Sequence, residues 1–136
     1  MAETFRFSLV SPERELFAGD VLQVDAPGVE GEFGVLPHHA PFMTILKPGV
    51  VRIYEEGAVT PVFVRGGFAD VTPGGFTILA EEAVRLAEVD SAELDGMITD
   101  AKADAEDPGD EARRQRAAER LVYLQEMRSA LDAQKH

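Results

Sequence analysis

The sequence predicts a mostly β protein with a helical end: a β-sandwich or flattened barrel, followed by two helices. Glycine and proline are frequent up to about residue 88, and beyond it only Gly96, Pro108 and Gly109 occur. The spacing of apolar residues changes at the same place, from the alternation of strands to the period of helices. We therefore expect two domains, residues 1–88 and residues 89–136.

The first domain consists of short alternating runs between turn residues. Phe5, Phe7 and Leu9 alternate with polar residues, which is the period of a half-buried strand. Further strands are expected over residues 20–26, 50–54, 60–64, 68–72 and 76–80, separated by glycine and proline turns. Short strands at this spacing are typical of sandwiches and barrels. In the apolar run that follows Pro41, Phe42 and Ile45 are expected to fill the core.

The second domain is expected to form an antiparallel hairpin of two helices. Asp90, with Glu93 three residues on, resembles a capping box and predicts a helix start. Residues 107–109, Asp-Pro-Gly, end that helix. The apolar face of the first helix consists of Leu94, Met97, Ile98, Ala101 and Ala105, and that of the second consists of Ala117, Leu121, Leu124, Met127 and Leu131. A turn this short places the helices side by side.

The charges of the two helices are opposite in sign. Residues 90–111 carry nine acids against Lys102 alone, whereas residues 112–136 carry six bases, including Lys135, against three acids. The helices should therefore attract each other, although an exposed ion pair contributes only about 0.2 to 1 kcal/mol. Because the apolar seam is rich in alanine, we expect the hairpin to be marginally stable.

The overall composition excludes several classes of protein. A net charge of −12 argues against nucleic acid and against anionic lipid as partners, because both need a basic surface. The absence of cysteine excludes disulfides and a thiolate zinc site. The N-terminal residues lack the pattern of a signal peptide, so we expect none, and no apolar stretch of about 20 residues is present. We expect a cytoplasmic protein that reaches a membrane only through other proteins.

The stretch "GEFGVLPHHAPFMTILKPG", residues 31–49, contains the only adjacent histidines, and the remaining histidine is His136. On an extended segment His38 and His39 point to opposite sides, so they cannot easily share a metal. We expect one buried and one exposed histidine, and no metal or cofactor. The glycines at 28, 31 and 34 have the wrong spacing for a phosphate-binding loop.

No catalytic constellation is found in the sequence. There is no serine in a nucleophile elbow and no carboxylate pair within an apolar strand, so we expect a protein that is not an enzyme. An alternative is a free-standing sandwich that binds a small ligand or a carbohydrate. Such a module would need exposed aromatic side chains on one face, but tryptophan is absent and Tyr54 and Tyr123 are the only tyrosines.

The segments "SPERELFAGDVLQVDAPGVEGEFGVLPHHAPFMTILKPGVVRI" and "RGGFADVTPGGFTILAEEA" resemble the bacterial epsilon subunit of the F-type rotary ATP synthase. The resemblance implies a ten-stranded β-sandwich and a two-helix domain. It also implies a non-catalytic rotor subunit of the central stalk, on the cytoplasmic face of the plasma membrane. Its partners would be the gamma subunit and the ring of c subunits, and it would couple proton transport to ATP synthesis. The C-terminal helices would contact the alpha and beta subunits and regulate ATP hydrolysis.

The same resemblance implies which residues contact the ring of c subunits. They are Glu32, Phe33, Gly34, Val35, Leu36, Pro37, His38 and His39. Gly31 and Gly34 are expected to allow a tight turn, and Pro37 and Pro41 to hold the loop extended. The loop tip would then offer Glu32 and a histidine to a polar surface.

Some bacterial relatives bind ATP through a motif at the start of the second helix, and this chain matches that motif in part. Asp110, Arg113 and Arg120 match it. Gly109 stands where the motif has an aliphatic residue, and Arg114 where it has alanine. We therefore expect weak or absent ATP binding. The alternative role of these arginines is to pair with the acidic first helix.

Overall fold

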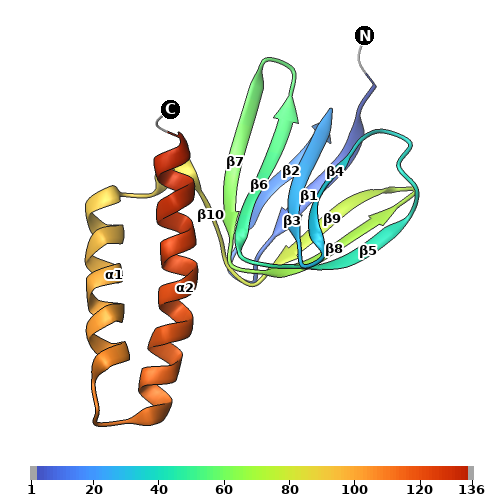
Figure 1. The fold of residues 1–136 in the computed structure, drawn as a ribbon. Coiled ribbons are helices and arrows are strands. Elements are labelled where there is room, and N and C mark those ends of the chain that lie inside the picture. Colours follow the sequence, from blue (N-terminus) through green and yellow to red (C-terminus); the bar gives the residue numbers. More distant parts are fainter. Residues whose placement is uncertain (1–2, 135–136) are drawn as a thin grey trace. The chain divides into compact units, whose positions relative to one another are not determined.

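In the computed structural model, residues 3–134 are described, so Lys135 and His136 lie outside the described residues. Contacts divide the chain into two compact units, residues 1–87 and residues 88–136. The first unit contains the strands and the second contains the two long helices (Figure 1).

The first unit is a ten-stranded sheet that folds into a sandwich, as the resemblance implied. Its strands are β1 (Phe5–Val10), β2 (Glu15–Val21), β3 (Gln23–Gly28), β4 (Gly31–Val35), β5 (Phe42–Leu46), β6 (Gly49–Glu55), β7 (Ala58–Val64), β8 (Gly67–Thr72), β9 (Gly75–Ala80) and β10 (Ala83–Arg85). They follow the order β10-β7-β6-β3-β5-β8-β9-β1-β2, and β4 pairs with β3 beside this path. The pair β1 and β9 is parallel, and the other pairs are antiparallel.

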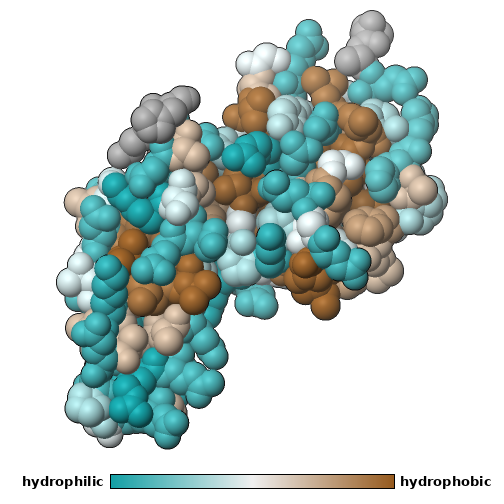
Figure 2. All heavy atoms as spheres, viewed as in Figure 1, coloured by the Kyte–Doolittle hydropathy of each residue, from teal (hydrophilic) through white to brown (hydrophobic). Residues whose placement is uncertain are grey.

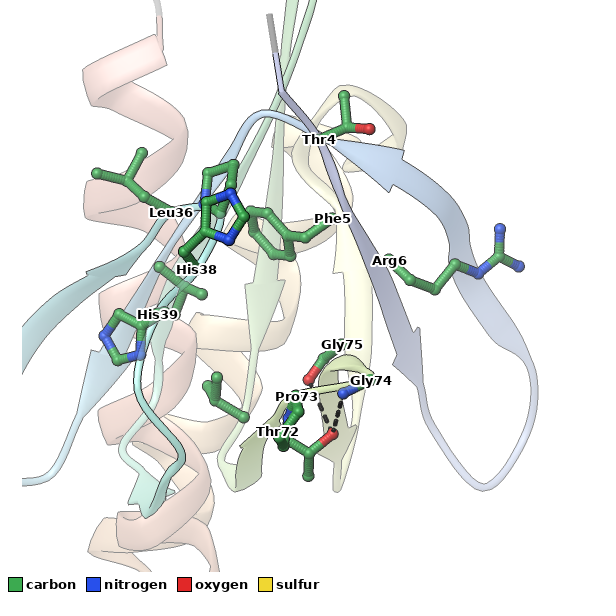
Figure 3. A pocket seen from close by; sticks show the side chains of 13 residues that line it. Thr4, Phe5, Arg6, Leu36, His38, His39, Thr72, Pro73, Gly74 and Gly75 are labelled. Carbon is green, nitrogen blue, oxygen red and sulfur yellow. Dashed lines mark hydrogen bonds between the residues drawn. The ribbon is translucent and has the colours of Figure 1, made fainter.

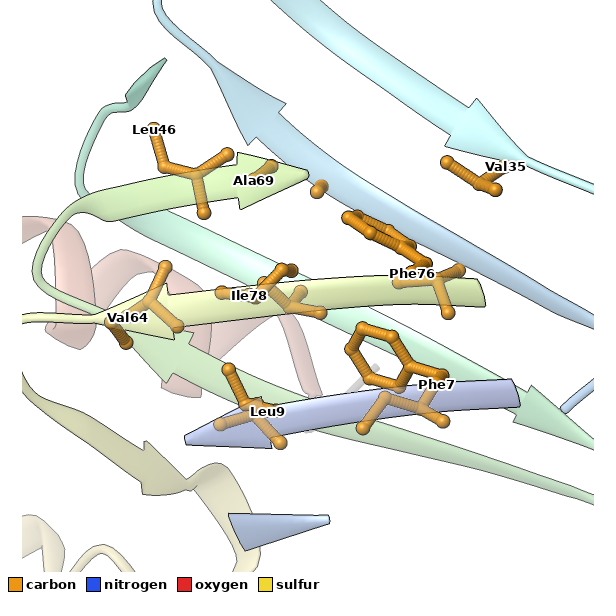
Figure 4. Close-up of a cluster of buried hydrophobic side chains, with 14 of the residues drawn as sticks. Phe7, Leu9, Val35, Leu46, Val64, Ala69, Phe76 and Ile78 are labelled. Carbon is orange, nitrogen blue, oxygen red and sulfur yellow. The ribbon is translucent and has the colours of Figure 1, made fainter. Parts of the chain in front are cut away.

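The core lies between the inner faces of the folded sheet, as Figure 4 shows. Alternate residues of each strand point inward, so Phe7 and Leu9 of β1 are fully buried. The Phe7 ring lies 5.1 Å from that of Phe76, centroid to centroid. This alternation confirms the strand predicted at Phe5–Leu9.

The strand predicted over residues 20–26 is wrong in its bounds. The chain bends at Leu22, so β2 ends at Val21 and a new strand, β3, begins at Gln23. Residues 31–34, expected as a turn, all belong to strand β4.

The expectation that Phe42 and Ile45 fill the core is also wrong. Ile45 is 59% exposed and Phe42 is 38% exposed. In β5 the side chain of Leu46 is buried, so its neighbour Ile45 must lie on the outer face. Phe42, at the start of β5, packs edge-on against Phe33 of β4, with ring centroids 5.1 Å apart.

The second unit is the predicted helical hairpin, α1 (Ser91–Glu106) and α2 (Glu111–Gln134), after a 3-10 turn, η1 (Leu86–Glu88). Asp90 caps α1, and its side chain accepts a hydrogen bond from the Glu93 N–H. The seam is formed by Leu94, Ala101, Ala117, Leu124 and Leu131, which are all buried. Met97, expected on this face, is 49% exposed, so that assignment is wrong.

Ion pairs join the two helices, as the opposite charges predict. Asp104 of α1 lies 3.1 Å from Arg113 and 3.5 Å from Arg120 of α2. Asp95 lies 3.4 Å from Arg128, near the other end of the hairpin. Among residues 3–134, no helix is long and apolar enough to cross a lipid bilayer.

Candidate functional site

The predicted ring-contact residues begin on a hairpin formed by β3 and β4. Gly28 pairs with Gly31 across a two-residue turn at Val29 and Glu30. Gly31 has φ +134°, which side chains rarely adopt, so the predicted role of this glycine in a tight turn holds. The hairpin turn is fixed to β5 because the Val29 N–H donates to the Ile45 carbonyl, at 2.9 Å.

Gly34 has a different role from the one predicted. It lies within β4, opposite Asp25 of β3, and a Cβ atom at this position would be 2.8 Å from Asp25 Oδ1. This glycine therefore leaves room for a carboxylate.

The Asp25 carboxylate is held by two neighbours. Gln23 Nε2 donates to Asp25 Oδ1 at 2.7 Å, and the Tyr54 hydroxyl donates to Oδ2 at 2.8 Å. The hydrogen bond to Asp25, together with burial, raises the pKa of Tyr54 above its usual 10.0. Both carboxylate oxygens are thus occupied, and the cluster ties β6 to the β3–β4 hairpin.

The eight predicted contact residues do not form a single loop tip. Glu32 lies at the hairpin turn, whereas Leu36 to His39 follow the other end of β4. Val35, between them, is 1% exposed and belongs to the core. A strand advances about 3.3 Å per residue, so Glu32 and His38 lie at opposite ends of this strand. The set therefore comprises two separate surfaces.

Residues 36–39 form a tight turn that exposes both histidines. The His39 N–H donates to the Leu36 carbonyl at 3.2 Å, and His38 has φ 68°. A proline at the second position and a positive φ at the third are the features of a type II turn. His38 Nε2 lies 2.7 Å from Glu3 Oε2, both on exposed side chains. The expectation of one buried histidine on an extended segment is therefore wrong.

A hollow of about 520 Å³ lies beside this turn (Figure 3). Three segments line it: residues 4–6, 35–39 and 71–75. Thr72 holds the third segment in a tight turn, because its Oγ1 accepts from the Gly74 N–H at 3.2 Å. In Figure 3 the Arg6 side chain extends away from His38 and His39, so these three side chains do not converge on one ligand position.

A row of apolar residues crosses the outer face of β5, β8, β9 and β1. Ile45 pairs with Phe68, Phe68 with Leu79, and Leu79 with Val10. Ile45 is 59% and Leu79 54% exposed, and Met43, farther along β5, is 62% exposed. In Figure 2 apolar side chains on the molecular surface are brown among hydrophilic ones in teal.

The sequence interpretation missed this apolar row. The run Phe-Met-Thr-Ile-Leu at residues 42–46 could have indicated it. Residues 42 and 46 on one face of the strand and residues 43 and 45 on the other are all large and apolar. Large apolar residues on both faces are typical of strands that are buried on both sides.

The nucleotide-motif residues at the start of α2 are engaged within the hairpin. The Arg113 N–H donates to Asp110 Oδ1 at 3.3 Å, so Asp110 caps the helix. The guanidinium groups of Arg113 and Arg120 meet at Asp104. The structure brings the two arginines together around a carboxylate.

Comparison with known proteins gives one consistent family. The family model of the ATP synthase delta/epsilon chain β-sandwich domain matches residues 4–86. The ATP synthase epsilon chain of Hyphomonas neptunium is 54% identical over 134 residues, covering 96% of this chain and 98% of that protein. The epsilon chain of Maricaulis maris is 47% identical over 129 residues, covering 95% and 97%.

Solved structures agree with these relatives. A chain of the Euglena gracilis mitochondrial ATP synthase, from a structure of its OSCP, F1 and c-ring parts, superposes with a TM-score of 0.81 at 30% identity, covering 94% of this chain and 81% of that one. A chain from the central stalk and c-ring of the Tetrahymena thermophila enzyme has a TM-score of 0.63 at 16% identity and covers 95% and 97%. The second likeness concerns the fold alone.

Proposed function

The chain belongs to the ATP synthase delta/epsilon family as an epsilon chain, a non-catalytic subunit of the central stalk, and from this premise we propose that it joins the gamma subunit to the ring of c subunits. In this role the sandwich turns with both partners and keeps them in fixed register. Proton flow through the ring is thereby coupled to ATP synthesis. The subunit would lie at the cytoplasmic face of the bacterial plasma membrane and reach the membrane only through the ring.

The apolar row on β5, β8, β9 and β1 is the single observation that best supports a permanent partner. Large side chains exposed in a contiguous row mark a protein interface. Burying one such side chain contributes about 1.5 to 3 kcal/mol. We assign this face, centred on Ile45, Phe68 and Leu79, to the gamma subunit, because attachment to gamma must persist through every turn.

The polar ends of β4 suit the contact with the ring. Glu32 at the hairpin turn and the two histidines at the other end are exposed and charged or polar. Charges at the rim of an interface influence association and register more than stability. We propose that residues 32–39 supply the ring contact, with Glu32 and the turn at residues 36–39 as two separable parts of it.

The helical hairpin is proposed to be the regulatory part. Its exposed side chains would contact the alpha and beta subunits and thereby limit ATP hydrolysis. Val122 of α2 is 58% exposed and Met97 of α1 is 49% exposed, so each helix carries an apolar side chain available to a partner.

Charge substitutions on the apolar row test the gamma contact. Ile45→Glu and Leu79→Glu each place a charge in the proposed interface, so the affinity for gamma should fall about tenfold or more. Val59→Glu is the matched control, because Val59 of β7 is 51% exposed and lies outside the row. Binding of purified gamma is measured by surface plasmon resonance. Equal affinity for all three variants would contradict the assignment.

Two further variants test the ring contact part by part. Glu32→Lys changes the contact at the start of β4, in the β3–β4 hairpin. The double change of His38 and His39 to Asp changes the contact in the turn that follows β4. Either should raise the ratio of protons moved to ATP made in membrane vesicles, because protons then pass without driving synthesis, and neither should unfold the subunit. Glu56→Lys, at an exposed position in the β6–β7 turn, is the control. A wild-type ratio in both test variants would contradict the proposal.

A further inference from the structure

The outer edge of β4 carries backbone groups that point away from the sheet. β4 pairs with β3 along one side. In β3 the Pro27 carbonyl accepts from the Lys47 N–H, at 2.9 Å, so Pro27 directs this group toward β5 and away from β4. In an antiparallel pair, when the backbone N–H and C=O of one residue point away from the neighbouring strand, those of the residue opposite it point away as well. Glu32, which is paired with Pro27, therefore directs its N–H and C=O outward, and Gly34 does so two residues later.

These outward groups are accessible. Glu32 and Gly34 are both exposed. Among residues 3–134, the outward backbone groups of Glu32 and Gly34 have no backbone hydrogen-bond partner. Unpaired groups along a strand edge form a template on which another strand can pair.

The other two edge strands of the sheet, β10 and β2, are covered. β10, at one end of the strand order, lies against β2, at the other end. The Arg85 guanidinium of β10 donates to the Leu16 carbonyl of β2. These two edges cover each other, and the edge of β4 stays open.

We propose that an extended, basic segment of a neighbouring subunit adds to β4 as a further strand. Glu30 and Glu32 give this edge negative charge, which selects a segment with lysine or arginine opposite them. Gly34 carries no side chain, so an incoming backbone can approach closely there. Strand addition uses main-chain hydrogen bonds for affinity and side chains for selectivity. The proposal rests on the assembly role given above.

A second copy of this chain fits the edge poorly. Two β4 edges paired antiparallel would bring Glu30 and Glu32 of each copy near one another, and like charges across a strand pair are destabilising. The net charge of −12 on each chain adds to the repulsion. The same acids that discourage self-pairing favour a basic strand.

A proline substitution separates backbone pairing from side-chain charge. Glu32→Pro removes the outward N–H without removing a bond to β3, and prolines are tolerated at such edge positions. Glu32→Gln is the matched control, because it removes the charge and keeps the N–H. Each variant is expressed in cells in place of the wild-type subunit, and its retention in the detergent-purified ATP synthase is measured after a salt wash. We expect E32P to be retained about tenfold less than E32Q.

Hydrogen exchange provides an independent readout in the wild-type protein. The amides of Glu32 and Gly34 should exchange about tenfold or more slowly in the assembled enzyme than in the isolated subunit, while the exposed Glu56 amide in the β6–β7 turn changes little. Equal exchange in both states overturns the proposal, even if E32P fails to fold.

The outcomes distinguish this proposal from the assembly role. If the wild-type subunit does not purify with the enzyme, both the assembly role and the strand-addition proposal fail. If it does, and E32P and E32Q are retained equally, strand addition alone fails. A dimer of the isolated subunit that E32P dissociates would identify a second copy as the occupant and also overturn the proposal.

Discussion

Asp25 occupies the space in which a side chain at Gly34 would begin, since a Cβ on Gly34 would lie 2.8 Å from Asp25 Oδ1. The carboxylate cannot move aside without cost, because Gln23 and Tyr54 hold its two oxygens. The glycine in the middle of the contact segment is thus required by packing between β3 and β4. The hairpin that carries Glu32 depends on this fit.

Gly34→Ala should destabilise the sandwich. The added methyl group must displace Asp25 and break at least one of its hydrogen bonds, which costs about 1 to 3 kcal/mol. The expected result is a lower midpoint in urea unfolding followed by circular dichroism. Gly19→Ala is the control, because a Cβ at Gly19 of β2 would meet the Phe17 ring at an ordinary 3.6 Å. Removing the carboxylate by Asp25→Ala should make Gly34→Ala less costly, and strictly additive effects would contradict this explanation.

Tyr54 should make stability depend on pH in the alkaline range. Because the hydrogen bond to Asp25 raises the Tyr54 pKa in the folded state, the unfolded chain loses this proton first, near pH 10. The stabilisation is therefore complete below about pH 10 and is lost as pH rises through the folded pKa. Urea unfolding at several pH values should show wild type more stable than Tyr54→Phe by about 0.5 to 1.5 kcal/mol at pH 7, with the difference shrinking above pH 10. A stability difference between wild type and Tyr54→Phe that stays constant to pH 11 would contradict this explanation. Tyr123→Phe is the control, because it removes the hydroxyl of the other tyrosine.

Alternation and capping were sufficient to predict most of the architecture. β1, β6, β7, β8 and β9 were found from alternating residues, and α1 from its capping residue Asp90. Local signals determine most of these elements, since β1, β6, β8 and β9 each have one buried face and α1 has a capped start.

The remaining elements depend on long-range contacts. β4 contains two glycines and one buried valine, so its strand conformation depends on pairing with β3. The exposure of Ile45 follows from the register between β5 and β8, which no local pattern specifies. The contact residues were expected as one loop tip because the sequence does not show that a core residue, Val35, divides them.

Gly96→Ala should stabilise the helical hairpin. Gly96 lies inside α1, and a Cβ there would meet no atom within 4 Å. Alanine restricts the unfolded chain and favours the helix by about 0.5 to 1 kcal/mol. Thermal unfolding of helical circular dichroism should shift upward. Ala103→Gly, at an exposed position in the same helix, is the reverse control and should lower the midpoint. A downward shift for Gly96→Ala would contradict this expectation.

The isolated subunit should bind ATP weakly or not at all. Arg113 and Arg120, the two basic members of the partial motif, already pair with Asp104 at 3.1 Å and 3.5 Å. The phosphates of a nucleotide would have to displace this carboxylate. Each exposed pair contributes only about 0.2 to 1 kcal/mol, so the arginines alone do not prevent binding. The two departures from the motif weaken binding more. Gly109 offers no apolar side chain to contact the base. Arg114 lies where the motif has a small residue, and its guanidinium donates to the Asp107 carbonyl at 3.4 Å.

Titration calorimetry with magnesium-ATP tests this expectation. A site whose Kd equals the ATP concentration stabilises the hairpin by only about 0.4 kcal/mol, so a weak site would not act as a sensor. Asp104→Asn frees both arginines and should strengthen binding if the carboxylate competes with phosphate, whereas Asp95→Asn, which affects the pair at the other end of the hairpin, should not. Micromolar affinity in the wild type, abolished by Arg113→Ala, would show that the partial motif is sufficient. In that case Asp104 must release the arginines whenever nucleotide is present, and the ion pairs of the hairpin would be part of a nucleotide-dependent switch.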